Sequence, residues 1–180
     1  MIITAKNGRE VCLRQLHPGD FDNLYDYLQN LSANTKHRFA PHEFDKQSIL
    51  DLYKNPNEYL GYVAVDVLTN QIVAYSILKM GWLAHDLDRL QSYGLVPDIH
   101  SDCTFAPSVA DQWQSCGMGN ALFSFICSDL KATGIKRIIL WAGVDSDNQK
   151  AINFYLKNGF RLLGQFEYNG LNDDMLLELF

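Results

Sequence analysis

The stretch between residues 103 and 141 narrows the possible folds of this chain more than any other. Cys103–Val109 has the pattern of a strand, Asn120–Lys131 carries apolar residues at helical spacing, and Arg137–Trp141 is typical of a buried strand. Gly134 is placed to end the helix. A strand, helix and strand in this length predict a right-handed crossover between two parallel neighbouring strands.

Alternating and helical patterns place further elements on both sides of this crossover. Before it we expect a strand at Val11–Leu16, a break at His17–Asp20, and then a helix through about Leu31. A second helical region to about Tyr53 and a hairpin of strands Tyr59–Val67 and Ile72–Lys79 follow. After it we expect a helix capped by Asp147 or Asn148 that runs to Asn158–Gly159, then strands at about Phe160–Tyr168 and Asp174–Leu179. Residues 81–100 form an excursion with room for one short helix.

The composition indicates one globular domain over residues 1–180, because 47% of the residues are hydrophobic and no linker or repeat divides the chain. We expect no membrane span and no export signal, and therefore a cytoplasmic location. The net charge of −6, with no long Lys/Arg tract, opposes nucleic-acid binding. Four scattered cysteines show no CxxC pair, so we expect no metal.

The most informative motif is the run Gln114, Ser115, Cys116, Gly117, Met118 and Gly119, directly after a strand and before a helix. Two glycines two residues apart let successive backbone N–H groups and the positive end of the helix point at one anion, such as a pyrophosphate. For an isolated Gly-x-Gly, a tight strand-to-helix turn without a ligand is the better explanation. The run is neither a Walker A loop nor the three-glycine dinucleotide motif.

The chain resembles the GNAT acetyltransferase superfamily in two signatures. The phosphate-binding signature, Gln/Arg-x-x-Gly-x-Gly/Ala, is matched by Gln114, Gly117 and Gly119. The second signature, an Asn followed by Ala, Tyr and a closing Gly-Phe, is matched in the segment 148–160 by Asn148, Ala151, Tyr155, Gly159 and Phe160. Both occur in the family's order, and the order of elements along the chain also fits.

The resemblance implies a mixed α/β fold, the GNAT fold. Its central twisted sheet is mostly antiparallel, with about seven strands, a parallel fourth and fifth strand that splay apart, and about four flanking helices. The resemblance also implies acetyl-CoA as acyl donor. Backbone groups near Val109 would pair with the pantetheine arm, residues 114–119 would hold the pyrophosphate, and Asn148 and Ala151 would line the cofactor arm.

Tyr155 is the residue that the resemblance places beside the thioester sulfur. Its phenol stays protonated at neutral pH and can donate to the departing thiolate, so it is a candidate general acid. Asn148, Ala151 and Tyr155 are spaced by three and four residues and share one helical stripe. The implied reaction is direct transfer in a ternary complex. An inactive acyl-CoA-binding sensor and a nucleotide-binding enzyme remain alternatives.

The proton acceptor and the acceptor amine are less constrained. Asp102 is the first candidate for the base, because many GNAT enzymes carry an acidic residue early on this strand; His100, His85 and Asp86 are alternatives, and a solvated strand-end carboxylate is another reading. Arg38, His42 and His85 are candidate substrate-binding residues in two polar and aromatic segments. The partner is expected to be a small-molecule or peptide amine, and a homodimer is possible.

Overall fold

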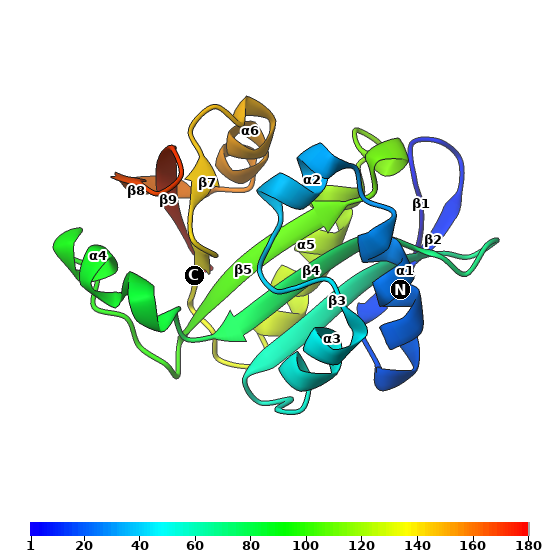
Figure 1. Ribbon diagram of the computed structural model, residues 1–180, viewed down its shortest axis with the longest axis horizontal. Helices are drawn as coiled ribbons and strands as arrows, with labels where there is room; N and C mark the ends of the chain where they lie inside the picture. Colours follow the sequence, from blue (N-terminus) through cyan, green and yellow to red (C-terminus); the bar gives the residue numbers. More distant parts are fainter. Residues whose placement is uncertain (180) are drawn as a thin grey trace. The chain divides into compact units, whose positions relative to one another are not determined.

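The computed structural model describes residues 1–179 (Figure 1). Its strands are β1 (Ile2–Thr4), β2 (Glu10–Gln15), β3 (Tyr59–Asp66), β4 (Ile72–Met80), β5 (Asp102–Val109), β6 (Arg137–Leu140), β7 (Val144–Asp145), β8 (Arg161–Glu167) and β9 (Leu171–Glu178). Its α-helices are α1 (Phe21–Gln29), α2 (Ala33–Arg38), α3 (Lys46–Leu52), α4 (Leu87–Ser92), α5 (Met118–Leu130) and α6 (Gln149–Lys157). Three 3₁₀ turns lie at Pro18–Asp20, Ala84–Asp86 and Asp111–Trp113.

The chain forms two compact units, and β4 and β5 pass from one to the other along their length. The first unit comprises Met1–Ile77 and Ala106–Ile126, and the second comprises Leu78–Phe105 and Cys127–Phe180. The expectation of a single domain stays a prediction.

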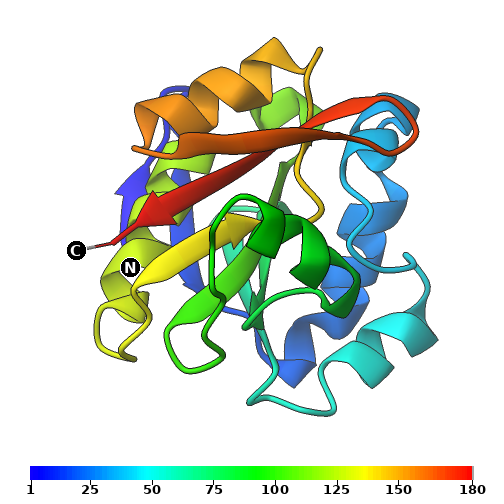
Figure 2. The same ribbon diagram turned by 90° about the vertical axis from the view of Figure 1, so that its left-hand side faces the viewer.

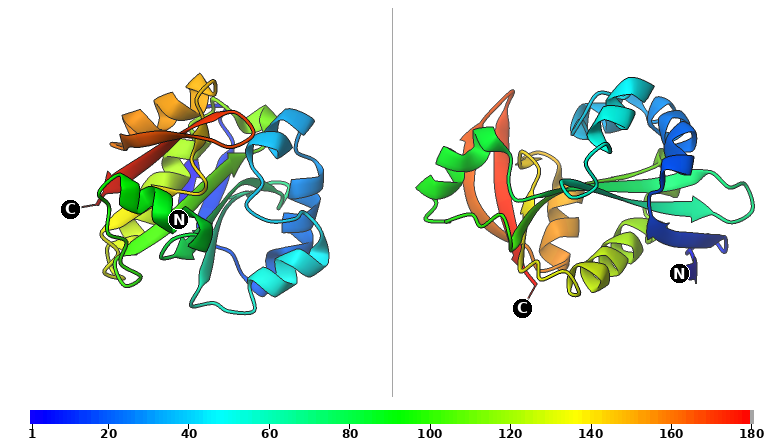
Figure 3. Two further views of the ribbon diagram at one scale, coloured as in Figure 1. Left: turned by 60° about the vertical axis from the view of Figure 1, so that its left-hand side comes forward. Right: turned by 90° about the horizontal axis from the view of Figure 1, so that it is seen from below.

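In the first unit, a sheet in the order β1, β2, β3, β4 and β5 carries helices on both faces. The helices α1, α2 and α3 lie on one face of β3 and β4, and α5 lies on the other (Figure 3). The ring of Tyr62 on β3 meets Phe125 of α5 edge to face, with 6.2 Å between their centroids. Both faces are therefore covered, which explains why β3 and β4 read as nearly continuous apolar runs.

In the second unit, β6 pairs in parallel with β5 and antiparallel with β9, and β9 also pairs antiparallel with β7 and β8. The helix α6 lies alongside β8 and β9 (Figure 2). The excursion predicted at residues 81–100 contains α4, and it packs on this sheet through a core of Leu90, Leu95, Ile139 and Leu176. The Tyr93 ring packs closely against Gly164 of β8, and a Cβ on residue 164 would overlap that ring.

The mixed α/β fold and the predicted parallel pair are confirmed, and the pairing runs from Asp102 opposite Arg137 to Phe105 opposite Leu140. The counts of elements differ from expectation. β1 and β7 are additional strands of three and two residues, too short to give an alternating pattern. The second helical region is two short helices, because Asp45 caps a new helix by accepting a hydrogen bond from the Ser48 N–H at 2.9 Å. The splaying expected between the parallel strands stays a prediction.

Candidate active site

The run from Gln114 to Gly119 forms a turn with two residues in the left-handed region, and it leads directly into α5. Ser115 has φ of 64° and Gly117 has φ of 87°. A Cβ on Gly117 would meet only the side chain of Lys6 at ordinary contact distance, so the need for glycine there comes from the backbone angle. The helix begins at Met118, two residues earlier than its apolar spacing predicted, so Met118 and Gly119 belong to its first turn.

The backbone N–H groups of this turn are mostly unpaired. Cys116 donates to the Trp113 carbonyl at 3.3 Å, and Ala121 closes the first helical turn on the Gly117 carbonyl at 3.0 Å. Within residues 1–179, the N–H groups of Ser115, Gly117, Met118 and Gly119 donate to no protein acceptor. Four free donors at the start of a 13-residue helix suit the oxygens of a phosphate or diphosphate.

The turn is fastened to its surroundings by hydrogen bonds to backbone carbonyls. The Lys6 N–H donates to the Cys116 carbonyl at 3.2 Å, and the Gln114 side chain donates to the Val109 carbonyl at 3.3 Å. Ala110 donates to the Val73 carbonyl on β4 at 2.9 Å. The Gln114 side chain therefore links the predicted diphosphate turn to Val109 at the end of β5 by a hydrogen bond.

Asp111 connects the same turn to the start of α2. Its carboxylate accepts from the Ser32 N–H at 3.0 Å, the Ser32 hydroxyl at 2.8 Å and the Thr35 hydroxyl at 2.7 Å. These hydrogen bonds hold the pKa of Asp111 below its usual value, with the Ser32 N–H as the largest cause. No sequence pattern predicts this contact, because the partners lie 76 and 79 residues apart.

The second predicted signature lies on α6, in the other unit. Asn148 is the N-cap of α6, and its Oδ1 accepts from the Ala151 N–H at 3.3 Å. This leaves its amide nitrogen without an acceptor among residues 1–179. Ala151 is half-buried, one turn from the buried Tyr155, so the three residues follow one stripe of the helix as their spacing predicted.

Tyr155 is only 7% exposed, and its ring meets those of Phe154 and Phe160 edge to face, with centroids 5.2 Å away in each case. Burial raises the pKa of its phenol, which therefore stays protonated across the physiological range. Its hydroxyl forms no hydrogen bond with any residue of the described chain, 1–179. The side chain thus combines a ring fixed by packing with a hydroxyl that has no hydrogen-bond partner among residues 1–179.

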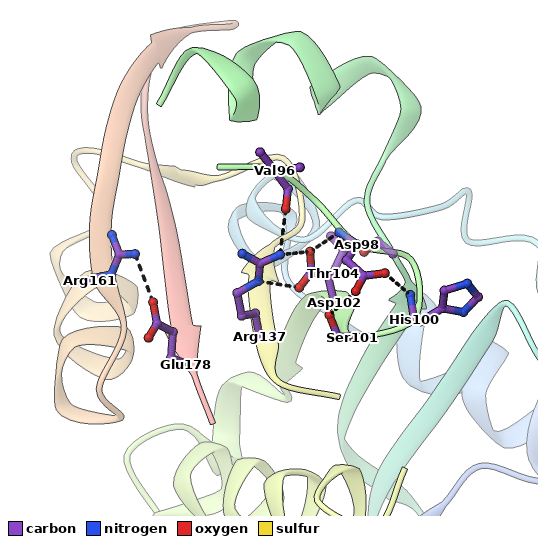
Figure 4. Close-up of polar contacts among 10 residues, drawn as sticks. Val96, Asp98, His100, Ser101, Asp102, Thr104, Arg137, Arg161 and Glu178 are labelled. Atoms are coloured by element: carbon purple, nitrogen blue, oxygen red, sulfur yellow. Dashed lines mark hydrogen bonds and ion pairs between the residues drawn. The ribbon is translucent and has the colours of Figure 1, made fainter. Parts of the chain in front are cut away.

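Asp102 occupies a different setting from the one expected of a base. Its side chain is fully buried and forms a two-point ion pair with Arg137, at 2.6 Å from Nε and 2.8 Å from Nη2 (Figure 4). It also accepts from the Asp98 N–H at 2.7 Å, while Arg137 donates to the Val96 carbonyl at 2.9 Å. Because these donors occupy both oxygens, the arrangement gives Asp102 a structural role and argues against proton acceptance.

The three candidate acceptor-binding residues fall in separate places. Arg38 is exposed at the end of α2, and His42 is half-buried in the loop that follows; both belong to the first unit. His85 belongs to the second unit, where its side chain is 72% exposed and its Nε2 lies 3.3 Å from Asp86. The carboxylate of Asp86 is buried, and burial raises its pKa although Arg89 lies 2.8 Å away.

The comparisons with known proteins identify the family of the chain. Residues 23–160 match the family model of the acetyltransferase (GNAT) family, so the chain belongs to that family. The search of curated proteins found no match.

Solved structures share its fold at low sequence identity. The GNAT domain of S. lividans PAT is 18% identical with a TM-score of 0.76, covering 99% of this chain and 96% of that one. Spermidine N-acetyltransferase from Vibrio cholerae, solved with CoA and spermine, is 20% identical with a TM-score of 0.66, covering 94% and 95%. Ard1 from Thermoplasma volcanium is 17% identical with a TM-score of 0.63, covering 93% and 97%.

No helix among residues 1–179 is long and apolar enough to cross a membrane. The same residues hold no cluster of three His, Cys, Asp or Glu side chains arranged to bind a metal ion.

Proposed function

We propose that this GNAT family member is an N-acetyltransferase that moves an acetyl group from acetyl-CoA to a primary amine by direct attack in a ternary complex. The observation that carries the proposal is the set of four unpaired N–H groups in the turn 115–119. They would hold the diphosphate of the coenzyme, with the positive end of α5 behind them. Val109, Asn148 and Ala151 would line the pantetheine arm.

In this proposal Tyr155 is the general acid. The amine nitrogen attacks the thioester carbon, the C–S bond breaks, and the phenol donates its proton to the departing sulfur. The phenol recovers a proton from the newly formed amide nitrogen. Its raised pKa keeps it protonated between turnovers, and its partnerless hydroxyl is available for the sulfur.

The acceptor is proposed only as a class. Arg38, His42 and His85 are candidate contacts for a small-molecule or peptide amine, and a spermidine N-acetyltransferase among the structural relatives makes polyamines worth testing. We further propose a cytoplasmic location, because the four cysteines are all free thiols, as is usual in a reducing compartment. A homodimer stays a proposal.

The test is a panel of spermidine, an amino sugar, an aminoglycoside and a peptide with a free N-terminus, each with acetyl-CoA, following the release of free CoA thiol. We expect one class to give turnover well above hydrolysis. Calorimetry with CoA, ATP and NAD on the same preparation separates the alternatives. CoA binding without turnover of any amine would favour an acyl-CoA-binding sensor, and preference for ATP or NAD would refute the proposal.

A further inference from the structure

The turn that we assign to the diphosphate has no positively charged side chain of its own. Residues 90–130 contain no Lys and no Arg, and the neutral amide of Gln114 is engaged with the Val109 carbonyl. The unpaired N–H groups and the positive end of α5 offer only partial charges, whereas a diphosphate carries full negative charges. A cation from another part of the chain would complete this site.

Lys6 places its side chain against the turn. It lies in the loop between β1 and β2, beside the turn that follows β5, and its N–H donates to the Cys116 carbonyl at 3.2 Å (Figure 1). A Cβ on Gly117 would lie 3.7 Å from Cε of Lys6 and 3.8 Å from Cγ, so the stem of the lysine runs along Gly117. The ammonium group is one bond beyond Cε. Both segments belong to the first unit.

The ammonium group of Lys6 has no protein partner. Among residues 1–179, the Lys6 side chain forms no hydrogen bond, ion pair or contact with an aromatic ring. Asp111, the acidic residue nearest to the turn in the sequence, already accepts three hydrogen bonds from the start of α2. Most other basic side chains of the first unit do have a partner, namely Arg9, Arg14, Lys36, Lys46 and Lys54. The charge of Lys6 is therefore left for a ligand or for solvent.

The loop that carries Lys6 is anchored on both sides of it. Ala5 is buried, and its N–H donates to the Arg9 carbonyl at 2.8 Å. The Arg9 guanidinium lies 4.9 Å from the centre of the Trp113 ring and pairs with the buried carboxylate of Asp66. Arg9 is thus held by a pair that is costly to break, and it fixes the loop beside the turn. Lys6 extends from this fixed backbone.

We propose that Lys6 is a coenzyme-binding residue whose ammonium group pairs with the diphosphate held by the turn 115–119. The inference rests on the proposed function. The backbone N–H groups would orient the phosphate oxygens, and the ammonium group would add a full positive charge and three donors. No motif of the turn indicates this residue, because Lys6 belongs to a different part of the sequence.

Coenzyme A carries two phosphate groups that a lysine could pair with, the diphosphate and the 3′-phosphate. We assign the diphosphate, because the Lys6 stem lies against Gly117, in the middle of the unpaired N–H groups. Dephospho-CoA lacks only the 3′-phosphate, and pantetheine lacks both groups, so these compounds separate the two assignments. Lys6 acts in binding alone, so its loss should raise the KM for acetyl-CoA and leave kcat at saturation unchanged.

The test compares calorimetric titrations of wild type, Lys6→Met and Lys6→Arg with CoA, dephospho-CoA and pantetheine. Met keeps an unbranched stem against Gly117 and removes the charge, whereas Arg keeps the charge. We expect Lys6→Met to bind CoA and dephospho-CoA about tenfold more weakly than wild type and pantetheine equally well, and Lys6→Arg to stay within about threefold. Because salt screens exposed charges, CoA affinity should fall more with rising salt in wild type than in Lys6→Met.

The matched control is Lys131→Met, which removes the same charge from an exposed lysine just beyond α5 and should leave CoA affinity at the wild-type value. The midpoint of thermal unfolding of Lys6→Met should match wild type, because its side chain has no protein hydrogen bond to lose among residues 1–179. Should that variant misfold, a wild-type CoA affinity that salt does not weaken would still overturn the proposal.

Three other results would also overturn it. They are equal CoA affinity in wild type and Lys6→Met, equal losses in Lys6→Met and Lys6→Arg, and a loss for CoA without a loss for dephospho-CoA, which would move Lys6 to the 3′-phosphate. Failure of the proposed function looks different, because wild type itself would then bind no CoA or would bind pantetheine as tightly as CoA.

Discussion

The Tyr155 side chain combines a packed ring with a hydroxyl that has no protein hydrogen bond among residues 1–179. Its contributions to stability and to activity can therefore be measured separately. In Tyr155→Phe the ring keeps its contacts with Phe154 and Phe160, and no protein hydrogen bond is lost among residues 1–179. We expect the midpoint of thermal unfolding and CoA affinity to stay as in wild type, while kcat falls about 100-fold through loss of the proton donor. Steady-state release of CoA thiol measures the change, and an unchanged kcat would remove the assigned role.

The ion pair of Asp102 and Arg137 should act on stability. In Arg137→Ala the fully buried carboxylate of Asp102 loses its counter-charge, and the free energy of unfolding should fall by about 3 kcal/mol. Denaturant unfolding measures this. Arg161→Ala is the matched control, because Arg161 and Glu178 are 59% and 60% exposed and such pairs contribute less than about 1 kcal/mol. Equal losses in both variants would contradict the structural role of Asp102.

The sequence predicted single residues well where a local pattern constrained them. Asn148, Ala151 and Tyr155 follow the helical stripe that their spacing indicated, and the Ser115 to Gly119 run forms the turn that its glycines indicated. Asp102 was different, because its partner Arg137 lies 35 residues away and faces it only through the parallel register of β5 and β6. A strand-end aspartate in sequence carries no sign of such a partner.

The turn between β5 and α5 should bind coenzyme only while Ser115 and Gly117 keep their left-handed backbone angles. Gly117→Ala places a Cβ at φ of 87°, which costs about 1–2 kcal/mol and tends to turn the N–H groups away. We expect CoA affinity to fall about tenfold by calorimetry. Gly134→Ala is the control, since Gly134 has φ of 84° and open space around it but lies after α5. Equal CoA affinities for the two variants would contradict the assignment.

Elements long enough to show a periodic apolar pattern were predictable from the sequence, and short elements were not. The parallel strands around α5, the hairpin of β3 and β4, and α6 all appear where their apolar spacing placed them. β1, β7 and the division between α2 and α3 depend on a few backbone hydrogen bonds and caps, such as Asp45 on Ser48, rather than on a periodic pattern. The path of residues 81–100 depends on packing against β6, β8 and β9, which are distant in sequence.

At the scale of the whole molecule, coenzyme binding should raise the stability of the folded state by mass action. CoA at about 100 times its dissociation constant stabilises a protein that binds it only when folded by about 2.7 kcal/mol. We therefore expect the midpoint of thermal unfolding to rise with CoA concentration in wild type, and to rise less in Gly117→Ala at the same concentration. A midpoint that does not respond to CoA in wild type would contradict binding to the folded state.

The most direct test of the central claim is a calorimetric titration of wild type with CoA and, separately, with pantetheine, which lacks the diphosphate and the nucleotide. If the free N–H groups of residues 115–119 hold the diphosphate, CoA should bind at one site per chain and pantetheine should bind at least 100-fold more weakly. Equal affinities for the two compounds, or no heat with CoA, would contradict the assignment of this turn.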